Sequence, residues 1–219
     1  MTSKKAAGDL HDERSDYQCD ELNRSDMHQN PFTMFGNWLQ NALDSNIRDA
    51  TAMSLATASA NGSPSVRIVL LKQYDESGLC WYTSYDSRKG RELASNPKAA
   101  LLLYWRELER QIRIEGHVEK TSDQQSINYF NSRPAGSKFS AAASPQSDVV
   151  PNQSWLVNKT RALQLKFTEE SITRPANWGG YRLKPEVFEF WQGRPSRLHD
   201  RFRYSLATTG EWTMDRLAP

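Results

Sequence analysis

The feature that most constrains the fold is a series of short apolar segments joined by tight turns. The first pair, residues 52–58 and 65–74, flanks Asn61-Gly62, and Asn-Gly between two apolar runs is a strong signal for a β-hairpin. Further strands are predicted at residues 79–85, 99–105, 111–120, 178–191, 197–204 and 212–216. Strands do not alternate regularly with helices. The pattern therefore predicts a mainly β fold of the α+β class, a mostly antiparallel barrel with helices packed outside.

Helices are predicted between and beside these strands. Residues 33–45 place apolar side chains at helical spacing. Ser87 is a good N-cap for a helix that ends before Asn96-Pro97. Two more helices are predicted at residues 123–132 and 153–168.

The chain of 219 residues divides into a polar leader and one domain. Residues 1–30 are highly charged without periodicity, so we expect a flexible leader, and residues 31–219 are long enough to form a single core. The leader has no apolar signal segment, and the longest apolar run, residues 99–105, is far shorter than the ~20 residues that span a bilayer. The two cysteines, Cys19 and Cys80, fit a reducing compartment. We expect a cytoplasmic protein that does not enter membranes.

Charge and motif content exclude several function classes. Lysine and arginine number 28 against 26 aspartates and glutamates, a net charge of +2, so no global basic field favours nucleic acid. The sequence lacks GxGxxG and GxxxxGK[ST] phosphate loops and HExxH or CxxC metal motifs. Rossmann, P-loop and metal sites are therefore disfavoured, and any anion site must be local.

Two cationic segments have both an ordinary and a functional interpretation. Arg88 and Lys89 follow Ser87 in the first turn of a predicted helix, where the dipole opposes cations and favours a bound phosphate. The alternative is a solvated charged turn. Arg67 and Lys72 bracket an apolar strand, where a buried cation must be paired or face a ligand. The alternative is an edge strand with exposed ends, and a ligand shared by both residues would need a bulge.

Two further basic clusters lie toward the C-terminus. Arg133, Ser137 and Lys138 surround a proline and a glycine and indicate either a second anion site or favourable cations at a helix end.

In residues 197–204, basic side chains alternate along a predicted strand and would share one face. They are Arg197, His199, Arg201 and Arg203. A solvated face, a nucleic-acid strand and a small anionic or aromatic ligand are the alternatives, and the balanced net charge favours the small ligand. The neighbouring arginines should lower the pKa of His199.

Several longer segments, in this order, resemble the pyridoxamine/pyridoxine 5′-phosphate oxidase family. They are RIVLLK (67–72), YTSYDSRKG (82–90), LERQIRIEG (108–116), YFNSRP (129–134), SPQS (144–147), WGGYR (178–182), EFWQGRPSRLHDR (189–201) and DRLAP (215–219). The resemblance covers the chain from about Arg14 to Pro219. It implies an FMN-binding split β-barrel that forms a homodimer with FMN at the interface.

The resemblance also implies an activity. Members of the family oxidise pyridoxine or pyridoxamine 5′-phosphate to pyridoxal 5′-phosphate in vitamin B6 biosynthesis and salvage. Oxygen reoxidises the flavin and yields hydrogen peroxide, and the amine substrate also releases ammonia. The alternative is a non-catalytic split-barrel protein that binds FMN or pyridoxal phosphate.

Site residues carry over to matching positions. The resemblance assigns FMN contacts to Arg67, Ile68, Val69, Leu70, Lys72, Tyr82, Thr83, Arg88, Lys89, Gln111, Gln146, Ser147, Trp191 and Arg201. It assigns substrate contacts to Arg14, Tyr17, Lys72, Tyr129, Arg133, Ser137, Arg197, Leu198 and His199. Arg14 and Tyr17 match a segment that closes over the substrate. Arg197 and His199 would hold the pyridine ring while hydride passes from C4′ to flavin N5, and Arg201 would favour the charge of the reduced flavin.

One segment departs from the family pattern. Where the family usually reads Gly-Ser-x-Ile-Gly-Ala-Trp-Ala-Ser, residues 136–144 carry Phe139, Ser140 and Ala142 in place of the isoleucine, the second glycine and the tryptophan. Loss of an indole leaves a void unless Phe139 repacks into it. We expect the change to affect substrate affinity and loop rigidity more than FMN binding.

Overall fold

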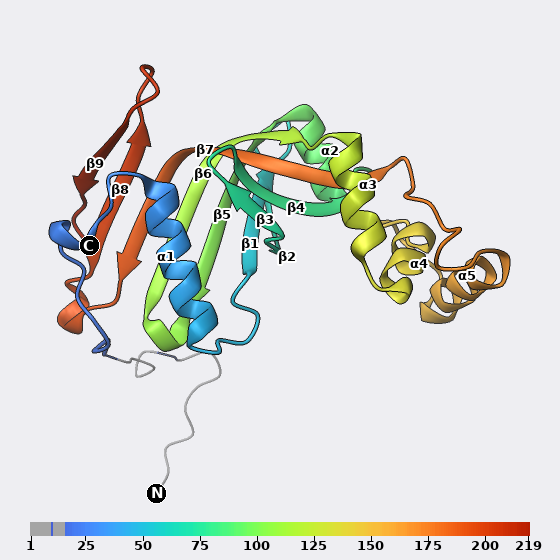
Figure 1. Cartoon of the computed structure of the whole chain (residues 1–219), viewed down its shortest axis with the longest axis horizontal. Helices are drawn as coiled ribbons and strands as arrows, with labels where there is room; N and C mark the ends of the chain where they lie inside the picture. Colours follow the sequence, from blue (N-terminus) through green and yellow to red (C-terminus); the bar gives the residue numbers. More distant parts are fainter. Residues whose placement is uncertain (1–9, 11–15) are drawn as a thin grey trace, which may run out of the picture.

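In the computed structural model, which describes residue 10 and residues 16–219, the strands form one curved antiparallel sheet (Figure 1). Its strands are β1 (Ala52–Ala58), β2 (Pro64–Leu70), β3 (Gln73–Asp75), β4 (Gly78–Ser84), β5 (Lys98–Trp105), β6 (Arg110–Lys120), β7 (Trp178–Gln192), β8 (Asp200–Leu206) and β9 (Trp212–Arg216). Seven follow the order β2-β1-β5-β6-β7-β4-β3, while β8 pairs with β7 and β9. The predicted mainly β, antiparallel architecture is confirmed.

Strand β7 joins the two halves of the sheet. It pairs with β6 along most of its length, with β4 through its first half and with β8 through its second half. The β6–β7 register shifts between Glu115 and Gly116, and a Cβ on Gly116 would lie 2.0 Å from the Lys184 carbonyl oxygen. Only glycine fits at this bulge, which bends the paired strands and helps the sheet curl into a half-barrel.

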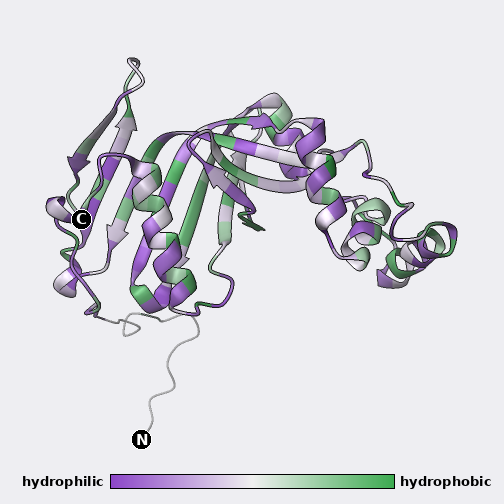
Figure 2. Cartoon of the chain, in the orientation of Figure 1, coloured by the Kyte–Doolittle hydropathy of each residue, from purple (hydrophilic) through white to green (hydrophobic). Residues whose placement is uncertain are grey.

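Helix α1 (Pro31–Asp44) covers the apolar face of the sheet (Figure 1). It begins two residues before the predicted start because the Asn30 side chain accepts the Phe32 N–H and Pro31 occupies the first turn. Trp38 meets Phe190 of β7 edge-on, with ring centroids 5.3 Å apart. Figure 2 shows the matching apolar character of the central strands.

The other helices were predicted with one exception. Helices α2 (Arg88–Ser95), α3 (Asp123–Ser132) and α5 (Gln153–Lys166) match predicted segments, and Ser87 caps α2 by accepting the Gly90 N–H. Helix α4 (Ala135–Ala143) was not predicted, because Pro134 and Gly136 read as a turn. Pro134 instead precedes the first turn, where a missing N–H costs nothing. Helices α3, α4 and α5 lie at the far end of the molecule from β8 and β9 (Figure 1).

Two predicted strands differ in the structure. The segment 65–74 divides into β2 and β3, because the backbone changes its pairing partner. The Leu71 N–H donates to the Thr51 carbonyl, which precedes β1, whereas the Lys72 N–H donates to the Cys80 carbonyl of β4. The prediction of one strand over 197–204 is wrong at its start. Ser196 and Arg197 have φ values of 55° and 61° in a 3-10 turn, η3 (Pro195–Arg197), and β8 begins only at Asp200. The left-handed backbone removes Arg197 and His199 from the strand.

The described part of the leader runs against the C-terminal strands. Leu22 is buried, and its N–H donates to the Asp200 carboxylate. The Tyr204 hydroxyl donates to the His28 carbonyl. Within residues 16–219, no helix has both the length and the apolar character needed to cross a bilayer. Arg14 lies outside the described residues.

Candidate active site

Many of the predicted site residues line one hollow, here called the basic hollow. It lies where β2 and β4 meet α2, α3 and α4, and it encloses about 400 Å³. Its lining residues are Ile68, Val69, Leu70, Lys72, Tyr82, Thr83, Lys89, Tyr129, Arg133, Pro134, Ser137, Gln146 and Trp178. This described lining contains three cationic side chains and no acidic one. Its field therefore favours an anion.

Lys89 is the most unusual of these cations. It is buried in the first turn of α2, and its Nζ donates to Thr83 Oγ1 at 3.0 Å and to Gln146 Oε1 at 3.3 Å. Burial, together with the nearby Arg67, lowers the pKa of Lys89 to about 8. A buried ammonium at a helix N-terminus is unfavourable by itself. A phosphate at the same place would offset both costs.

Arg67 and Arg88 are held beside the basic hollow by a buried carboxylate and do not line it. Glu92 Oε2 lies 3.4 Å from Arg67 Nη2, and Glu92 Oε1 lies 2.9 Å from Arg88 Nε. Burial would raise the pKa of Glu92, but hydrogen bonds from Ser65, Thr57 and Arg88 lower it to about 2. Of the two requirements stated for a buried cation at Arg67, pairing and a ligand, the structure shows the pairing.

Aromatic rings and a guanidinium form the other wall of the hollow. Tyr129 stacks on Tyr82 with centroids 3.8 Å apart and planes 17° apart, and Trp178 is nearly parallel to Tyr129. The Arg133 guanidinium carbon lies 4.7 Å from the centre of the Trp178 ring. Its Nη1 is buried without a hydrogen-bond partner among the described residues, and burial lowers the pKa of Arg133. An unpartnered donor on a side chain that lines a hollow without acids favours an anionic ligand.

The segment that departs from the family pattern forms α4 beside this wall. Phe139 is buried, whereas Ser140 and Ala141 line an adjoining hollow of about 280 Å³ together with Arg133. Lys138 is buried and turns away to Glu169, with Nζ and Oε1 3.4 Å apart. Of the predicted Arg133, Ser137 and Lys138 cluster, only the first two line the basic hollow.

A second group of predicted residues lies in a separate hollow on the sheet face. Gln111, Trp191 and Tyr17 line this hollow of about 560 Å³, and Ile68 borders both hollows. Tyr17 meets Trp191 edge-on with centroids 5.4 Å apart. The leader therefore contributes an aromatic side chain to this group, and Tyr17 is one of the residues that the resemblance assigns to the substrate.

His199 belongs to the same group. Its ring lies 4.7 Å from Trp191 and 5.4 Å from Tyr17, centroid to centroid. Its Nδ1 accepts the Arg194 N–H at 3.1 Å, which leaves the proton of the neutral ring on Nε2. Burial and the charges of Arg197 and Arg201 lower the pKa of His199, the direction predicted from its neighbours. The lowered pKa favours the neutral ring, whose Nε2–H can donate a hydrogen bond.

The predicted cationic face is partly neutralised. Arg201 Nη2 lies 2.8 Å from Glu189 Oε1, and Arg203 Nη2 lies 3.5 Å from Asp215 Oδ2.

Two further predicted site residues lie on the surface or in a strained backbone conformation. Leu198 is 70% exposed. Ser147, like Arg197, has a left-handed backbone, with φ of 77°. Such strained residues cluster at functional sites.

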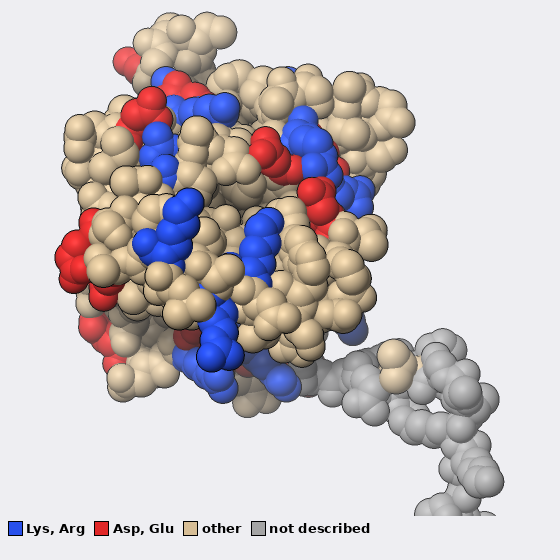
Figure 3. Space-filling view, turned by 90° about the vertical axis from the view of Figure 1, so that its right-hand side faces the viewer, with Lys and Arg blue, Asp and Glu red and all other residues tan. Residues whose placement is uncertain are grey.

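Figure 3 views the molecule from the end that carries α4 and α5. Basic side chains on this face form separate patches interspersed with acidic ones. The arrangement suits local anion sites better than a nucleic-acid track.

Sequence reasoning missed two residues that shape the site. Trp178 was read as the start of a strand and as part of the WGGYR segment, without a site role, although it stacks with Tyr129 and supports Arg133. Glu92 was not singled out, although its position four residues after Arg88 in a helix is a pairing signal.

Comparison with known proteins places the chain in a family. The sequence model described as pyridoxamine 5′-phosphate oxidase matches residues 39–167, and the pyridoxine 5′-phosphate oxidase C-terminal dimerisation region matches residues 178–219. A pyridoxine/pyridoxamine 5′-phosphate oxidase of Burkholderia mallei is 50% identical over 212 residues, covering 96% of this chain and 99% of that protein. One from Paraburkholderia phymatum is 50% identical over 210 residues, with the same coverage.

Solved structures agree with this placement. PhzG from Burkholderia lata, in complex with tetrahydrophenazine-1-carboxylic acid, superposes with a TM-score of 0.85 at 32% identity, covering 91% of this chain and 98% of that one. An FMN-binding protein of Nostoc punctiforme, related to pyridoxamine 5′-phosphate oxidase, shares the fold with a TM-score of 0.69 at 16% identity, covering 88% of this chain and 100% of that one. The chain therefore belongs to the pyridoxamine 5′-phosphate oxidase family of flavin-binding split-barrel oxidoreductases.

Proposed function

We propose that the protein is an FMN-dependent oxidase that converts pyridoxine or pyridoxamine 5′-phosphate to pyridoxal 5′-phosphate. Oxygen is the electron acceptor, hydrogen peroxide is released, and the amine also yields ammonia. The observation that carries the proposal is the basic hollow, where the unpartnered Arg133 Nη1 lies beside a stack of three aromatic rings. A phosphorylated aromatic ring has the chemistry that this pair of features favours.

The hollow has donors that suit FMN. Lys72, Lys89 and Thr83 offer cationic and hydroxyl donors for a phosphate, and the β2 segment Ile68–Leu70 offers backbone and apolar surface for a ring. Bound FMN would supply the hydride acceptor and the means of passing electrons to oxygen. Because Lys89 is buried away from water, its charge would interact strongly with the phosphate.

Separate residues would hold the substrate. Tyr129, Arg133 and Ser137 would bind its phosphate, and Arg197 with His199 would orient the pyridine ring. The lowered pKa of His199 favours the neutral ring, and with Nδ1 accepting a hydrogen bond its Nε2–H could donate one without adding charge. Tyr17 would cover the ring from the leader. The resemblance also assigns Arg14 to the substrate, but Arg14 lies outside the described residues.

We infer that the site is completed by a second copy of the chain. Within one chain, Gln111 and Trp191 line a different hollow from Lys72 and Lys89, although the family places all four at one flavin. The edge strand β2 exposes Val66, Ile68 and Leu70. A match to a C-terminal dimerisation region supports a homodimer in which this apolar edge is covered.

Two alternative functions can be distinguished from this proposal by experiment. The likeness to PhzG, a protein solved with tetrahydrophenazine-1-carboxylic acid, favours a larger unphosphorylated substrate, and the hollow beside Ser140 and Ala141 offers space for one. The other alternative is a binder of FMN or pyridoxal phosphate without turnover.

Steady-state assays separate these functions. We would incubate the flavin-loaded protein in air with pyridoxine 5′-phosphate, pyridoxamine 5′-phosphate or the tetrahydrophenazine acid, and measure aldehyde product and peroxide. The proposal predicts pyridoxal 5′-phosphate and peroxide in equal amounts from both B6 substrates. Turnover of the tricyclic acid alone supports the PhzG-like activity, and no turnover with any compound supports the binder.

A further inference from the structure

The described part of the leader is fastened to the tip of the β5–β6 hairpin at one carboxylate. Glu109 Oε2 accepts the backbone N–H of Gln18 at 2.7 Å and that of Cys19 at 2.9 Å. These two residues directly follow Tyr17, whose ring packs against Trp191 and His199. A carboxylate that accepts two successive backbone N–H groups fixes both the position and the direction of the chain.

The backbone of the hairpin tip places this carboxylate. Glu109 follows η2 (Arg106–Leu108) and has a left-handed conformation, with φ of 51° and ψ of 39°. Its own carbonyl accepts the Gly193 N–H at 2.8 Å. A Cβ at Gly193 would lie 2.7 Å from Cγ of Tyr17, so glycine is required for the ring to dock. The tip, β7 and the leader therefore meet at one point.

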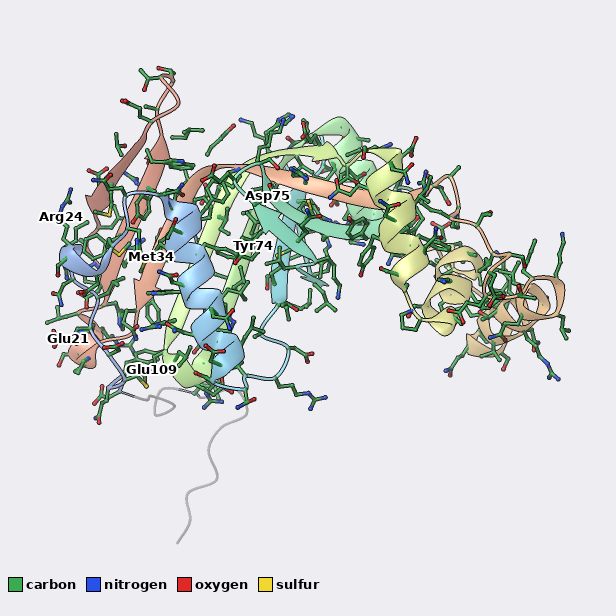
Figure 4. All side chains as sticks on the ribbon, in the orientation of Figure 1. Glu21, Arg24, Met34, Tyr74, Asp75 and Glu109 are labelled. Atoms are coloured by element: carbon green, nitrogen blue, oxygen red, sulfur yellow. The ribbon has the colours of Figure 1, made fainter. Side chains whose placement is uncertain are left out.

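Arg194 links the same leader segment to His199. Its Nη2 lies 2.8 Å from Glu21 Oε1, and its Nη1 donates to the Asp20 carbonyl at 3.2 Å. Its backbone N–H donates to His199 Nδ1. Arg110 Nη2 adds an ion pair to Asp20 Oδ2 at 2.8 Å. Figure 4 labels Glu109 and Glu21 at the end of the sheet where this leader segment runs.

We propose that Glu109 and Arg194 form a leader anchor that holds Tyr17 beside Trp191 and His199, where the pyridine ring of the substrate would bind. Glu109 is the principal positioning residue. The inference rests on the proposed function, because it assigns Tyr17 to the substrate. Neither anchor residue touches the substrate in this account. The anchor acts by holding the leader against the hairpin tip before the substrate binds. Substrate binding then has less of the leader to order and costs less conformational entropy.

Substrate kinetics test this role through Tyr17. Glu109→Ala is expected to raise KM for pyridoxine 5′-phosphate about tenfold, the effect of losing a charge-assisted hydrogen bond, with kcat and FMN content nearly unchanged. Glu109→Gln keeps an acceptor oxygen and should restore most of the affinity. Tyr17→Ala should raise KM similarly, and Glu109→Ala in that background should add nothing further. Effects that multiply in the double variant would overturn the proposal.

A second measurement needs no turnover. In the flavin-loaded protein, hydrogen–deuterium exchange of the peptide that contains Gln18 and Cys19 should accelerate in Glu109→Ala, because these N–H groups lose their acceptor. Glu107→Ala is the matched control, since it removes the same charge two residues away and should change neither exchange nor KM. Unchanged exchange in Glu109→Ala would overturn the anchor. Faster exchange in a protein that oxidises no B6 substrate would uphold the anchor and reject the proposed function.

Discussion

At the scale of single residues, Lys89 is a buried positive charge that would favour binding of an anion. Its ammonium group is buried at the start of α2, where desolvation and the helix dipole both oppose a positive charge. The three oxygen atoms within its reach belong to Thr83, Ser87 and Gln146, which are all neutral. The charge of Glu92 offsets part of this cost, and we propose that a bound phosphate supplies the rest.

The lowered pKa of Lys89 predicts a pH dependence for FMN binding. The free protein loses this proton as the pH rises through about 8, whereas a bound phosphate holds it. Binding above that pH must take up a proton, so the dissociation constant should rise about tenfold per pH unit between roughly pH 8 and 9.5. Quenching of FMN fluorescence by the flavin-free protein measures this. Lys89→Arg, charged throughout the range, should remove the slope, and an unchanged slope would contradict the assignment.

Arg197 predicts a separable effect on the chemical step. Its left-handed backbone places it in a turn beside His199 and outside the basic hollow. Arg197→Met should slow anaerobic flavin reduction by pyridoxine 5′-phosphate well over tenfold, because the ring loses an orienting contact. FMN content should stay the same. Stopped-flow absorbance measures the rate, and reduction at the parent rate would remove Arg197 from the substrate site.

At the scale of elements, local signals specified most helices and strands, and competing local signals explain the misses. The periodicity of residues 33–45, the Ser87 cap and the Asn61-Gly62 turn each led to the observed element. Helix α4 was missed because proline and glycine are turn residues in most settings. The strand start at residue 197 was wrong because alternation of side chains does not reveal a positive φ at Arg197.

Contacts between elements could not be predicted from local sequence patterns. The pairing of Arg67 with Glu92 joins β2 to α2, and the stack of Tyr82 on Tyr129 joins β4 to α3. The sequence flagged these side chains as charged or aromatic, but their partners lie 25 and 47 residues away. The resemblance to a family supplied the expected roles that spacing could not.

Gly90 allows α2 to pack closely against the backbone of Tyr85, just after β4. A Cβ there would lie 2.0 Å from the Tyr85 carbonyl oxygen, so the helix would have to shift together with Lys89. Gly90→Ala should lower the free energy of unfolding of the flavin-free protein by about 3 kcal/mol, measured by urea denaturation. Gly136→Ala in α4 is the control, because its Cβ would meet nothing within 4 Å. It should change stability by less than about 1 kcal/mol, and an equal loss in both variants would contradict the packing argument.

At the scale of the whole molecule, the predicted site residues of one chain are divided between two hollows. The basic hollow lies toward the α3–α4 end, and the hollow that contains Trp191, Gln111 and Tyr17 lies along the sheet face. Between them runs β2, an edge strand with three exposed apolar side chains. A natural protein rarely leaves such an edge uncovered. A second copy that covers it would also bring the two groups of residues to one flavin.

Val66 tests this arrangement without touching an assigned flavin contact. It is 68% exposed on the same strand as Ile68. Val66→Lys should shift the protein from dimer to monomer in sedimentation velocity and lower its FMN content, because each site loses its second half. Val66→Ile should preserve both properties. A Val66→Lys protein that remains a fully flavinated dimer would show that β2 is not at the interface.

The most direct test of the central claim is an anaerobic titration followed by visible absorbance. The purified protein should carry a bound-flavin spectrum that bleaches when pyridoxine 5′-phosphate is added without oxygen. The spectrum should recover, with peroxide formed, when air is admitted. A flavin spectrum that neither pyridoxine nor pyridoxamine 5′-phosphate bleaches would contradict B6 oxidation and direct attention to Phe139, Ser140 and Ala142 in α4.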